Sequence, residues 1–238
     1  MLHSRKTHML AMRYRKHFFA MALALVTVAT IGTLVTQKEA DSATSYAIGT
    51  GSYPQYITKM GTMMYTVNRS GYSVTPINTV TKSALSNISV GSTPVDPIVV
   101  GTDLYVTNSG AGTVSVINSL TNTVSNTITI VPGSSPWGGF LVGTDLYIGN
   151  NGSSSVSVID TVTKAVTNVI PVGNSATGIR AFGLVGSKLY VTNYNSNSVS
   201  VIDTVAKTVI TTIPVGSRPF TIEVLGTNVY IGNQSSGN

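Results

Sequence analysis

Hydrophobic and polar residues alternate along most of the chain in short segments. Between residues 155 and 159 this period of two predicts a strand with Val156 and Val158 on one face and Ser157 and Ile159 on the other. Similar segments, rich in Val, Ile, Thr and Tyr, are separated by Gly, Asn, Asp and Pro, which favour turns. No segment among them keeps a helical period, so the pattern predicts β-structure and excludes a solenoid of helix pairs.

The alternating segments recur in a fixed order along the chain. A segment of the form Leu-Tyr-Val-Thr-Asn comes first, at 64–68, 104–108, 146–150, 189–193 and 229–233. A segment like Ser-Val-Ser-Val-Ile-Asp-Thr follows the first four copies, at 73–81, 113–121, 155–163 and 198–206. A segment related to Val-Gly-x-x-Pro closes each unit, at 88–94, 128–136, 170–176 and 213–219, with an isolated first copy at 46–54. The chain is therefore a tandem repeat with a period of about 40–45 residues.

Each unit is predicted to form four antiparallel strands, which we call A to D. In the second unit these strands are expected at about 95–100, 103–107, 113–117 and 123–130. This period with four strands is typical of a β-propeller blade, whose faces must pack on neighbouring blades. The sequence therefore predicts an all-β propeller of four-stranded antiparallel blades, with about four full blades and a partial fifth. The repeated tyrosine of strand B is expected to pack between blades.

The units are expected at 54–93, 94–135, 136–175 and 176–218, with a partial unit at 219–238. An isolated D strand is predicted at 46–50, and the residues from Gln234 onward look like a B–C turn. Strand B of the last unit would then be an unpaired edge, which proteins normally cover. Three interpretations stay open: a truncated larger ring, an open ring, or a ring that another chain completes, including self-association through this edge strand.

The first 43 residues have the pattern of a signal peptide or signal anchor. A basic stretch is followed by the uncharged run 18–35 and then by small polar residues, which is typical of a secretory signal. An uncleaved anchor is the alternative, because this run is just long enough to span a bilayer. We therefore expect an exported protein, located outside the cell, on its surface or in the periplasm. Contact with the membrane is expected only through an uncleaved leader.

Charge and composition narrow the chemistry. The whole chain has a formal charge of +6, but beyond residue 43 eight Lys and Arg face six Asp and Glu, a net charge of +2 with no basic run. This argues against a nucleic-acid partner. The sequence has no Cys, and its three His lie within the first 17 residues. The repeats therefore lack the residues of common nucleophile–base pairs and zinc sites, and we expect no catalytic residue, metal or cofactor.

The Leu-Tyr-Val-Thr-Asn and Ser-Val-Ser-Val-Ile-Asp-Thr segments, with Val-Gly-x-x-Pro closing each unit, resemble the YVTN family of β-propeller repeat proteins. The resemblance covers residues 46–238. It implies a secreted or surface-associated protein of bacteria or archaea, including proteins like those of surface layers. Members with a closed ring usually have about seven blades, more than the units found here. The family supplies no catalytic motif that can be carried over.

Candidate binding residues are those that break the repeat on the face formed by the D–A and B–C loops and on strand A. Aromatic residues and arginines are enriched at binding hot spots. The candidates are Tyr53, Arg69, Tyr72, Asp96, Trp137, Arg180, Tyr194, Arg218 and Glu223. Tyr56 and Phe140 also break the repeat on strand A, and a three-residue insertion is expected around Arg180–Leu184.

These features favour a non-enzymatic binding or cell-surface module whose ligand is a protein or a cell-envelope glycan. One alternative is a lyase- or lactonase-like enzyme, with Asp96 or Glu223 as the general base. Another is an accessory subunit of a periplasmic redox system, in which the cofactor belongs to the partner. Bases of single-stranded nucleic acid could stack on Tyr53, Trp137 and Tyr194, but the small positive charge argues against this use.

Overall fold

A computed structural model of the protein describes residues 46–173 and 178–236. All strands belong to one compact unit, Ile48–Asn238. The predicted leader, 1–43, lies outside the described residues. Within the described ranges, no helix is long and apolar enough to cross a membrane.

The strands form five antiparallel sheets that follow one another along the chain. The first sheet contains β1 (Pro54–Met60), β2 (Met63–Asn68), β3 (Ser73–Asn78), β4 (Ser83–Ala84) and β5 (Ile88–Ser89), and the second contains β6 (Pro94–Val100), β7 (Asp103–Asn108), β8 (Thr113–Asn118) and β9 (Thr123–Thr129). The third contains β10 (Pro136–Val142), β11 (Asp145–Asn150), β12 (Ser155–Asp160) and β13 (Ala165–Pro171). The fourth contains β14 (Ile179–Val185), β15 (Lys188–Asn193), β16 (Ser198–Asp203) and β17 (Thr208–Pro214), and the last contains β18 (Pro219–Leu225) and β19 (Asn228–Asn233).

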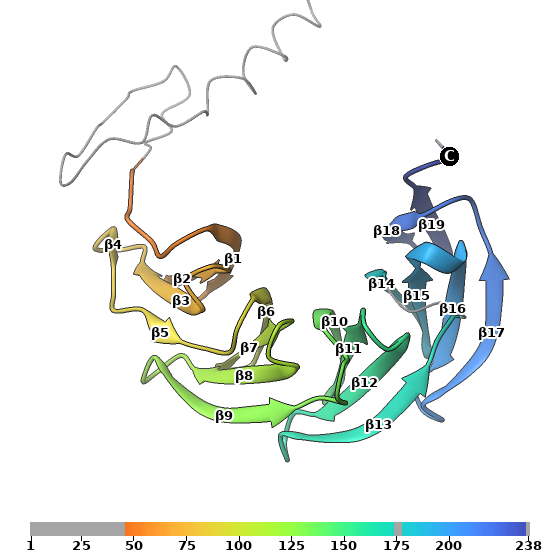
Figure 1. Ribbon diagram of the computed structural model, residues 1–238, viewed down its shortest axis with the longest axis horizontal. Coiled ribbons are helices and arrows are strands. Elements are labelled where there is room, and N and C mark those ends of the chain that lie inside the picture. The colour runs from red at the N-terminus through yellow and green to blue at the C-terminus, as the bar shows by residue number, and fades with distance from the viewer. Residues whose placement is uncertain (1–45, 174–177, 237–238) are drawn as a thin grey trace, which may run out of the picture. The chain divides into compact units, whose positions relative to one another are not determined.

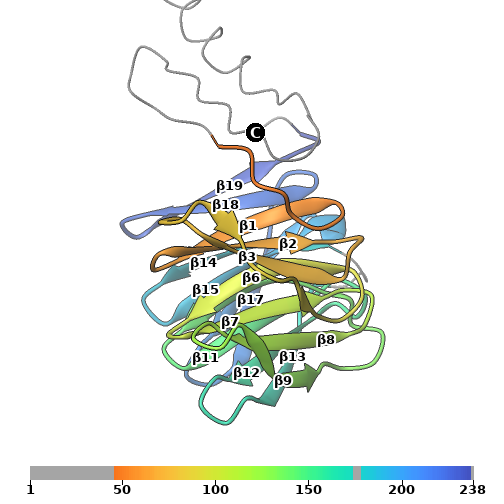
Figure 2. The same ribbon diagram turned by 90° about the vertical axis from the view of Figure 1, so that its left-hand side faces the viewer.

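The sheets are the blades of a propeller (Figure 1). The first strands of successive sheets, β1, β6, β10, β14 and β18, contact one another in that order and form the inner side of the arrangement. Figure 2 shows the same sheets from the side, with blades from different parts of the chain overlapping in the view. The prediction of an all-β propeller with four full blades and a partial fifth is confirmed.

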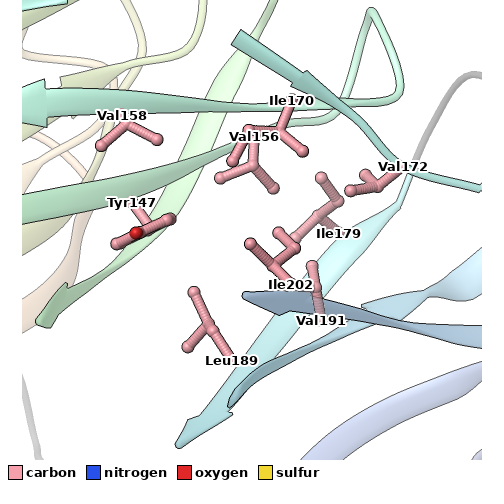
Figure 3. Close-up of a cluster of buried hydrophobic side chains, with 9 residues drawn as sticks. All are labelled: Tyr147, Val156, Val158, Ile170, Val172, Ile179, Leu189, Val191 and Ile202. Carbon is pink, nitrogen blue, oxygen red and sulfur yellow. The ribbon is translucent and has the colours of Figure 1, made fainter. Parts of the chain in front are cut away.

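The core lies between the blades rather than within them. Strand C of the third blade packs against both neighbouring blades. Val156 and Val158 lie in the interface with the fourth blade, and Ile159 lies in the interface with the second. Figure 3 shows Val156 and Val158 beside Tyr147, with Leu189 of the fourth blade in the same cluster. This confirms the alternation predicted from the sequence, because each strand presents its two faces to different neighbours.

In the first three blades the repeated tyrosine of strand B joins neighbouring blades, as predicted. The hydroxyl of Tyr105 donates a hydrogen bond to the Thr161 carbonyl oxygen at 3.2 Å, and that of Tyr147 donates to the Thr204 carbonyl oxygen at 3.2 Å. Both acceptors lie in the C–D turn of the following blade. The ring fills the interface and the hydroxyl fixes the next turn, so one residue sets both packing and registration.

The asparagine that ends strand B holds the B–C hairpin together. Asn108 Nδ2 donates to Thr113 Oγ1 at 3.0 Å and to Ser115 Oγ at 2.9 Å, and Asn68, Asn150 and Asn193 make the equivalent pair of bonds. The glycine of the preceding D–A loop lies directly on this amide: a Cβ at Gly91 would come within 2.7 Å of Asn108 Cγ. The repeated Asn and Gly therefore depend on each other, because the Asn amide occupies the space that a Cβ at the glycine would need.

Three expectations are corrected by the structure. Residues 46–50 form no strand, because no described strand lies beside them to pair with. The insertion of the fourth unit does not lie around Arg180–Leu184: Ile179 pairs with Asn193 just as Pro94 pairs with Asn108, so the additional residues precede strand A. Strand D of the first blade is divided into the short strands β4 and β5.

Candidate binding site

The inner strands begin with a β-bulge in every blade. The pairing with strand B shifts between Pro94 and Pro97 in β6, and equivalent shifts occur at the start of β1, β10, β14 and β18. A bulge bends the strand and redirects its side chains, and bulges are common beside functional sites. The residues at these five bulges include Gln55, Asp96, Trp137, Arg180 and Phe220. One local irregularity therefore supplies a side chain to the same end of each blade.

A buried threonine of strand B supports the bulge. Thr107 Oγ1 accepts a hydrogen bond from the Asp96 backbone N–H at 3.0 Å and donates to the Trp137 carbonyl oxygen at 2.6 Å. Thr192 Oγ1 accepts hydrogen bonds from the backbone N–H groups of Arg180 at 3.2 Å and Ala181 at 3.0 Å. The threonine of the repeated segment thus fixes the backbone from which the site residues project.

Three arginines and two aromatic rings alternate in a continuous series of contacts. The Arg69 guanidinium carbon lies 5.2 Å from the centroid of the Trp137 ring, and that of Arg180 lies 5.1 Å from the same ring. Arg180 also lies 5.4 Å from the Tyr194 ring, and Arg218 lies 5.8 Å from it. These are cation–π distances. We call these five residues the arginine–aromatic row; they come from the first, third and fourth blades and the loop before β18.

Neighbouring side chains hold the row at its ends. Arg69 Nη1 donates to Gln55 Oε1 at 3.2 Å. The Tyr194 hydroxyl donates to Gln234 Oε1 at 2.6 Å, and its ring meets the Phe220 ring edge-on with centroids 6.1 Å apart. These contacts connect B–C loops to the bulges and place the amides of Gln55 and Gln234 beside the row; we call these two side chains its polar rim.

The positive charge of the row is not neutralised by carboxylates of the described chain. The two ion pairs in the described ranges join lysines to aspartates, Lys164 to Asp103 at 2.7 Å and Lys207 to Asp145 at 2.9 Å, at the C–D and A–B turns of neighbouring blades. Within the same ranges Arg180 Nε is buried without a hydrogen-bond partner. This atom is too buried for a ligand to reach, but the three arginines have no carboxylate partner in the described ranges, so their charge is available to an anionic ligand.

One carboxylate lies close to this face. Burial raises the pKa of the Asp96 carboxyl, although the Gly139 N–H donates to its Oδ2 at 3.2 Å and partly opposes the shift. The pKa of Tyr56 is raised by burial and then by Asp96, whereas Arg69 and Arg180 act in the opposite direction. Tyr56 is thus within electrostatic reach of both Asp96 and the row, which places these groups around one region.

The structure brings together most of the residues predicted from the sequence. Arg69, Trp137, Arg180, Tyr194 and Arg218 form the row, and Asp96 is joined to Trp137 through Thr107. The predicted Tyr53 and Tyr72 lie in loops with 63% and 50% of their surfaces exposed and take part in no ring contact with the row. Glu223 does not join the site, because it is exposed within β18 and pairs across the sheet with Tyr230.

Some members of the site were missed by the sequence analysis. Gln55, Phe220 and Gln234 each occur once at positions that differ between units, so the rule of repeat-breaking residues could have found them. Thr107 was missed because it repeats at Thr192, and a repeated residue is ordinarily structural. In the described part of the chain, no group of three or more Asp, Glu, His or Cys side chains is placed to hold a metal ion.

Comparison with known proteins supports the fold. No model of a protein family matches the sequence, and no curated protein matches it. The chain is similar to Kuenenia stuttgartiensis hydrazine synthase (23% identity, TM-score 0.62, 76% of this chain and 54% of that chain). It is also similar to a virginiamycin B lyase from Staphylococcus aureus (13% identity, TM-score 0.69, 85% of this chain and 71% of that chain). A WD40 β-propeller domain is similar as well (10% identity, TM-score 0.60, 76% of this chain and 60% of that chain). The chain spans only 54–60% of the first three structures found. Fold and site together define a β-propeller with a cationic, aromatic face.

Proposed function

We propose that the protein is an exported, non-enzymatic propeller of the YVTN type that binds a cell-envelope ligand, a protein or a glycan, on the face formed by the D–A and B–C loops. The observation that carries this proposal is the arginine–aromatic row, which extends from Arg69 in the first blade to Arg218 before the last. Such residues dominate binding hot spots. The predicted secretory leader and the resemblance to surface-layer-like proteins support a location outside the cytoplasm.

The residue content of the repeats favours binding over catalysis. The virginiamycin B lyase that resembles this chain was solved as a catalytically inactive variant in which a histidine is replaced by alanine. The present sequence has no histidine after His17 and no cysteine at all. Histidine, the side chain that most often serves as a general base in enzymes, is therefore missing from the repeats.

A sedimentation assay with isolated bacterial cell envelopes tests the proposal. The full chain is expected to sediment with the envelopes, and the Arg180→Ala variant is expected to remain largely in the supernatant. Lys188→Ala is the matched control, because it removes one positive charge from the same blade at the opposite end of its strands. Failure of the wild-type chain to sediment, or equal sedimentation of Arg180→Ala, contradicts the proposal.

A second candidate function rests on Asp96. A carboxyl whose pKa is raised by burial, close to Tyr56, is suited to accept a proton in a lyase-like elimination. Glu223, the other carboxylate considered, is exposed on β18 and does not join the site. The test is incubation with lactones and with polyuronates, whose elimination products absorb in the ultraviolet. Turnover that Asp96→Asn abolishes supports this candidate, and absence of turnover by the wild-type chain contradicts it.

A further inference from the structure

We propose that the ligand of the arginine–aromatic row is a linear acidic polysaccharide, whose anionic groups bind the guanidinium groups of Arg69, Arg180 and Arg218. This inference rests on the proposed function and specifies its ligand class. Three observations carry it: the repetition of cations along the row, the engagement of the two rings by those cations, and the polar rim.

The repetition of cations favours a polymer over a small anion. Arg180 lies between Trp137 and Tyr194, and each ring has a further arginine within 6 Å of its centroid. A single carboxylate or phosphate would engage one guanidinium and leave the others unused. A chain with an anionic group on successive residues can engage all three, and each contact is a planar, two-pronged hydrogen bond when the group is a carboxylate.

The rings position the arginines and are not themselves open to nucleic-acid bases. Trp137 and Tyr194 each contact two guanidinium groups and are partly buried. Single-stranded nucleic acid needs aromatic faces on which bases stack, together with an electropositive groove. Because both rings already contact guanidinium groups, the row fits a polyanion that needs only the arginines, such as a carboxylated or sulfated polymer.

The rim around the row is suited to sugar hydroxyls. Gln55 and Gln234 present amides at its two ends, each already aligned by a member of the row. The exposed rings of Tyr53 and Tyr72 lie in the D–A and B–C loops of the first blade, on the same face as Arg69. Rings this exposed offer flat apolar faces on which the C–H faces of sugar rings can pack. We therefore assign the ligand to acidic polysaccharides rather than acidic proteins.

Titration of the full chain with oligogalacturonate tests the inference. Trp137 is the only tryptophan of the sequence, so its fluorescence reports binding at the row directly. Oligogalacturonate or dextran sulfate is expected to change this fluorescence, with binding that weakens as salt is added. The fully methyl-esterified oligomer and neutral dextran have the same backbones without the charge, and each is expected to bind at least tenfold more weakly than its acidic form. Galacturonic acid alone is expected to bind at least tenfold more weakly than its oligomer.

Variants separate the role of the row from that of the fold. Arg180→Ala is expected to weaken binding of the acidic oligomer at least tenfold, and Lys188→Ala is expected to leave it unchanged. Arg69→Ala, in the B–C loop of the first blade, is a second variant whose loss of binding cannot be attributed to a changed core. Preference for dextran sulfate over oligogalacturonate identifies sulfate as the anion, and the reverse identifies carboxylate.

Three results overturn the inference. They are equal binding of the esterified and acidic oligomers, acidic binding that survives both arginine variants, and equal affinity for a single-stranded oligonucleotide or a polyglutamate peptide. If the chain sediments with envelopes through Arg180 but binds none of the acidic polymers, the ligand class is wrong and the proposed function stands. If envelope sedimentation also fails, both are wrong.

Discussion

The strand B segment that contains the repeated tyrosine occurs both at the interface between the third and fourth blades and in the last sheet, β18–β19. Its tyrosine is buried at the first place and half exposed at the second. Tyr147 in the third blade is 0% exposed and donates its hydroxyl to Thr204 of the next blade. Tyr230, at the same position of the repeat, is 53% exposed. Among the described residues, no C–D turn follows β19 to cover it. The comparison shows that burial in this protein is a property of the neighbouring blade and not of the segment itself.

The same contrast extends to stability. In a repeat architecture the free energy of unfolding is approximately a sum of terms within repeats and terms between neighbours. Residues at the interface between the third and fourth blades contribute to the free energy that neighbouring blades gain by packing together. Residues of β18–β19 contribute less to this free energy. Equivalent substitutions at the two places should therefore differ in their cost.

The largest difference is expected for truncation of the repeated tyrosine. Tyr147→Ala is expected to lower the free energy of unfolding by about 3–5 kcal/mol, because it leaves a cavity in a fully buried interface. Tyr230→Ala should cost less than about 1 kcal/mol, since the ring is half exposed. Urea denaturation of the two variants measures both values. Similar losses would mean that the last sheet has a covering partner in solution.

The asparagine that ends strand B gives the next largest effect. Asn150→Ala removes the hydrogen bonds to Ser155 Oγ at 3.0 Å and Ser157 Oγ at 2.8 Å, and should cost about 1–3 kcal/mol because the partners stay buried. The equivalent Asn233 in β19 has no strand C beside it in the described structure, so Asn233→Ala should cost less than about 0.5 kcal/mol. Thermal unfolding of the two variants, compared with Asn150→Asp, tests this difference. Equal melting temperatures for the two alanine variants would contradict it.

Removal of the tyrosine hydroxyl alone should have a smaller effect. Tyr147→Phe is expected to cost about 1 kcal/mol through the lost bond to Thr204, and Tyr230→Phe almost nothing. Burial, followed by Asp145 and Asp203, raises the pKa of Tyr147 to about 12. Its contribution to stability is therefore fully present below pH 10 and is lost as the pH rises through about 12. The pKa of Tyr105 is also raised to about 12, so the phenolate absorbance change near pH 12 should become smaller in Tyr147→Phe without disappearing. A reduction near pH 10 instead would contradict the buried hydroxyl.

The ion pair at the edge of the interface should have the smallest effect. Lys207→Gln removes the contact with Asp145 at 2.9 Å and is expected to cost about 0.2–1 kcal/mol, because the pair is partly exposed. Asn228 of the last sheet corresponds to Asp145, the partner of Lys207, and its replacement by alanine should change little. Denaturation at low and high salt measures the difference. A cost for Lys207→Gln that does not fall with salt would show that the lysine acts through packing rather than charge.

Much of the fold could be predicted because it is locally determined. The strands of the second unit begin and end within two residues of the expected positions, since turn residues mark the hairpins and alternation marks the faces. The strand expected at 46–50 was wrong because a strand needs a hydrogen-bonding neighbour, and the sequence of that segment does not specify one. The insertion was misplaced because Ala176 was aligned with the repeated proline, whereas Ile179 is the equivalent residue: it pairs with Asn193 as Pro94 pairs with Asn108.

The candidate site could be predicted only in part. Its five arginine and aromatic members were found because they break the repeat. Glu223 also breaks the repeat but does not join the site, because it lies in the middle of β18 rather than at the bulge of that strand. Gln55 and Phe220 also break the repeat and could have been found by the same rule, but only the structure shows that they occupy the bulges beside the row.

The sequence by itself determined the repeat, the strand pattern, the residues of each hairpin and the absence of His and Cys from the blades, because each depends on neighbouring residues or on composition. Only the tertiary structure decided which repeated tyrosines are buried and that Arg69, Arg180 and Arg218 share one series of contacts. The physical reason is that burial and charge clustering depend on groups far apart in the chain, and packing of whole blades brings those groups together.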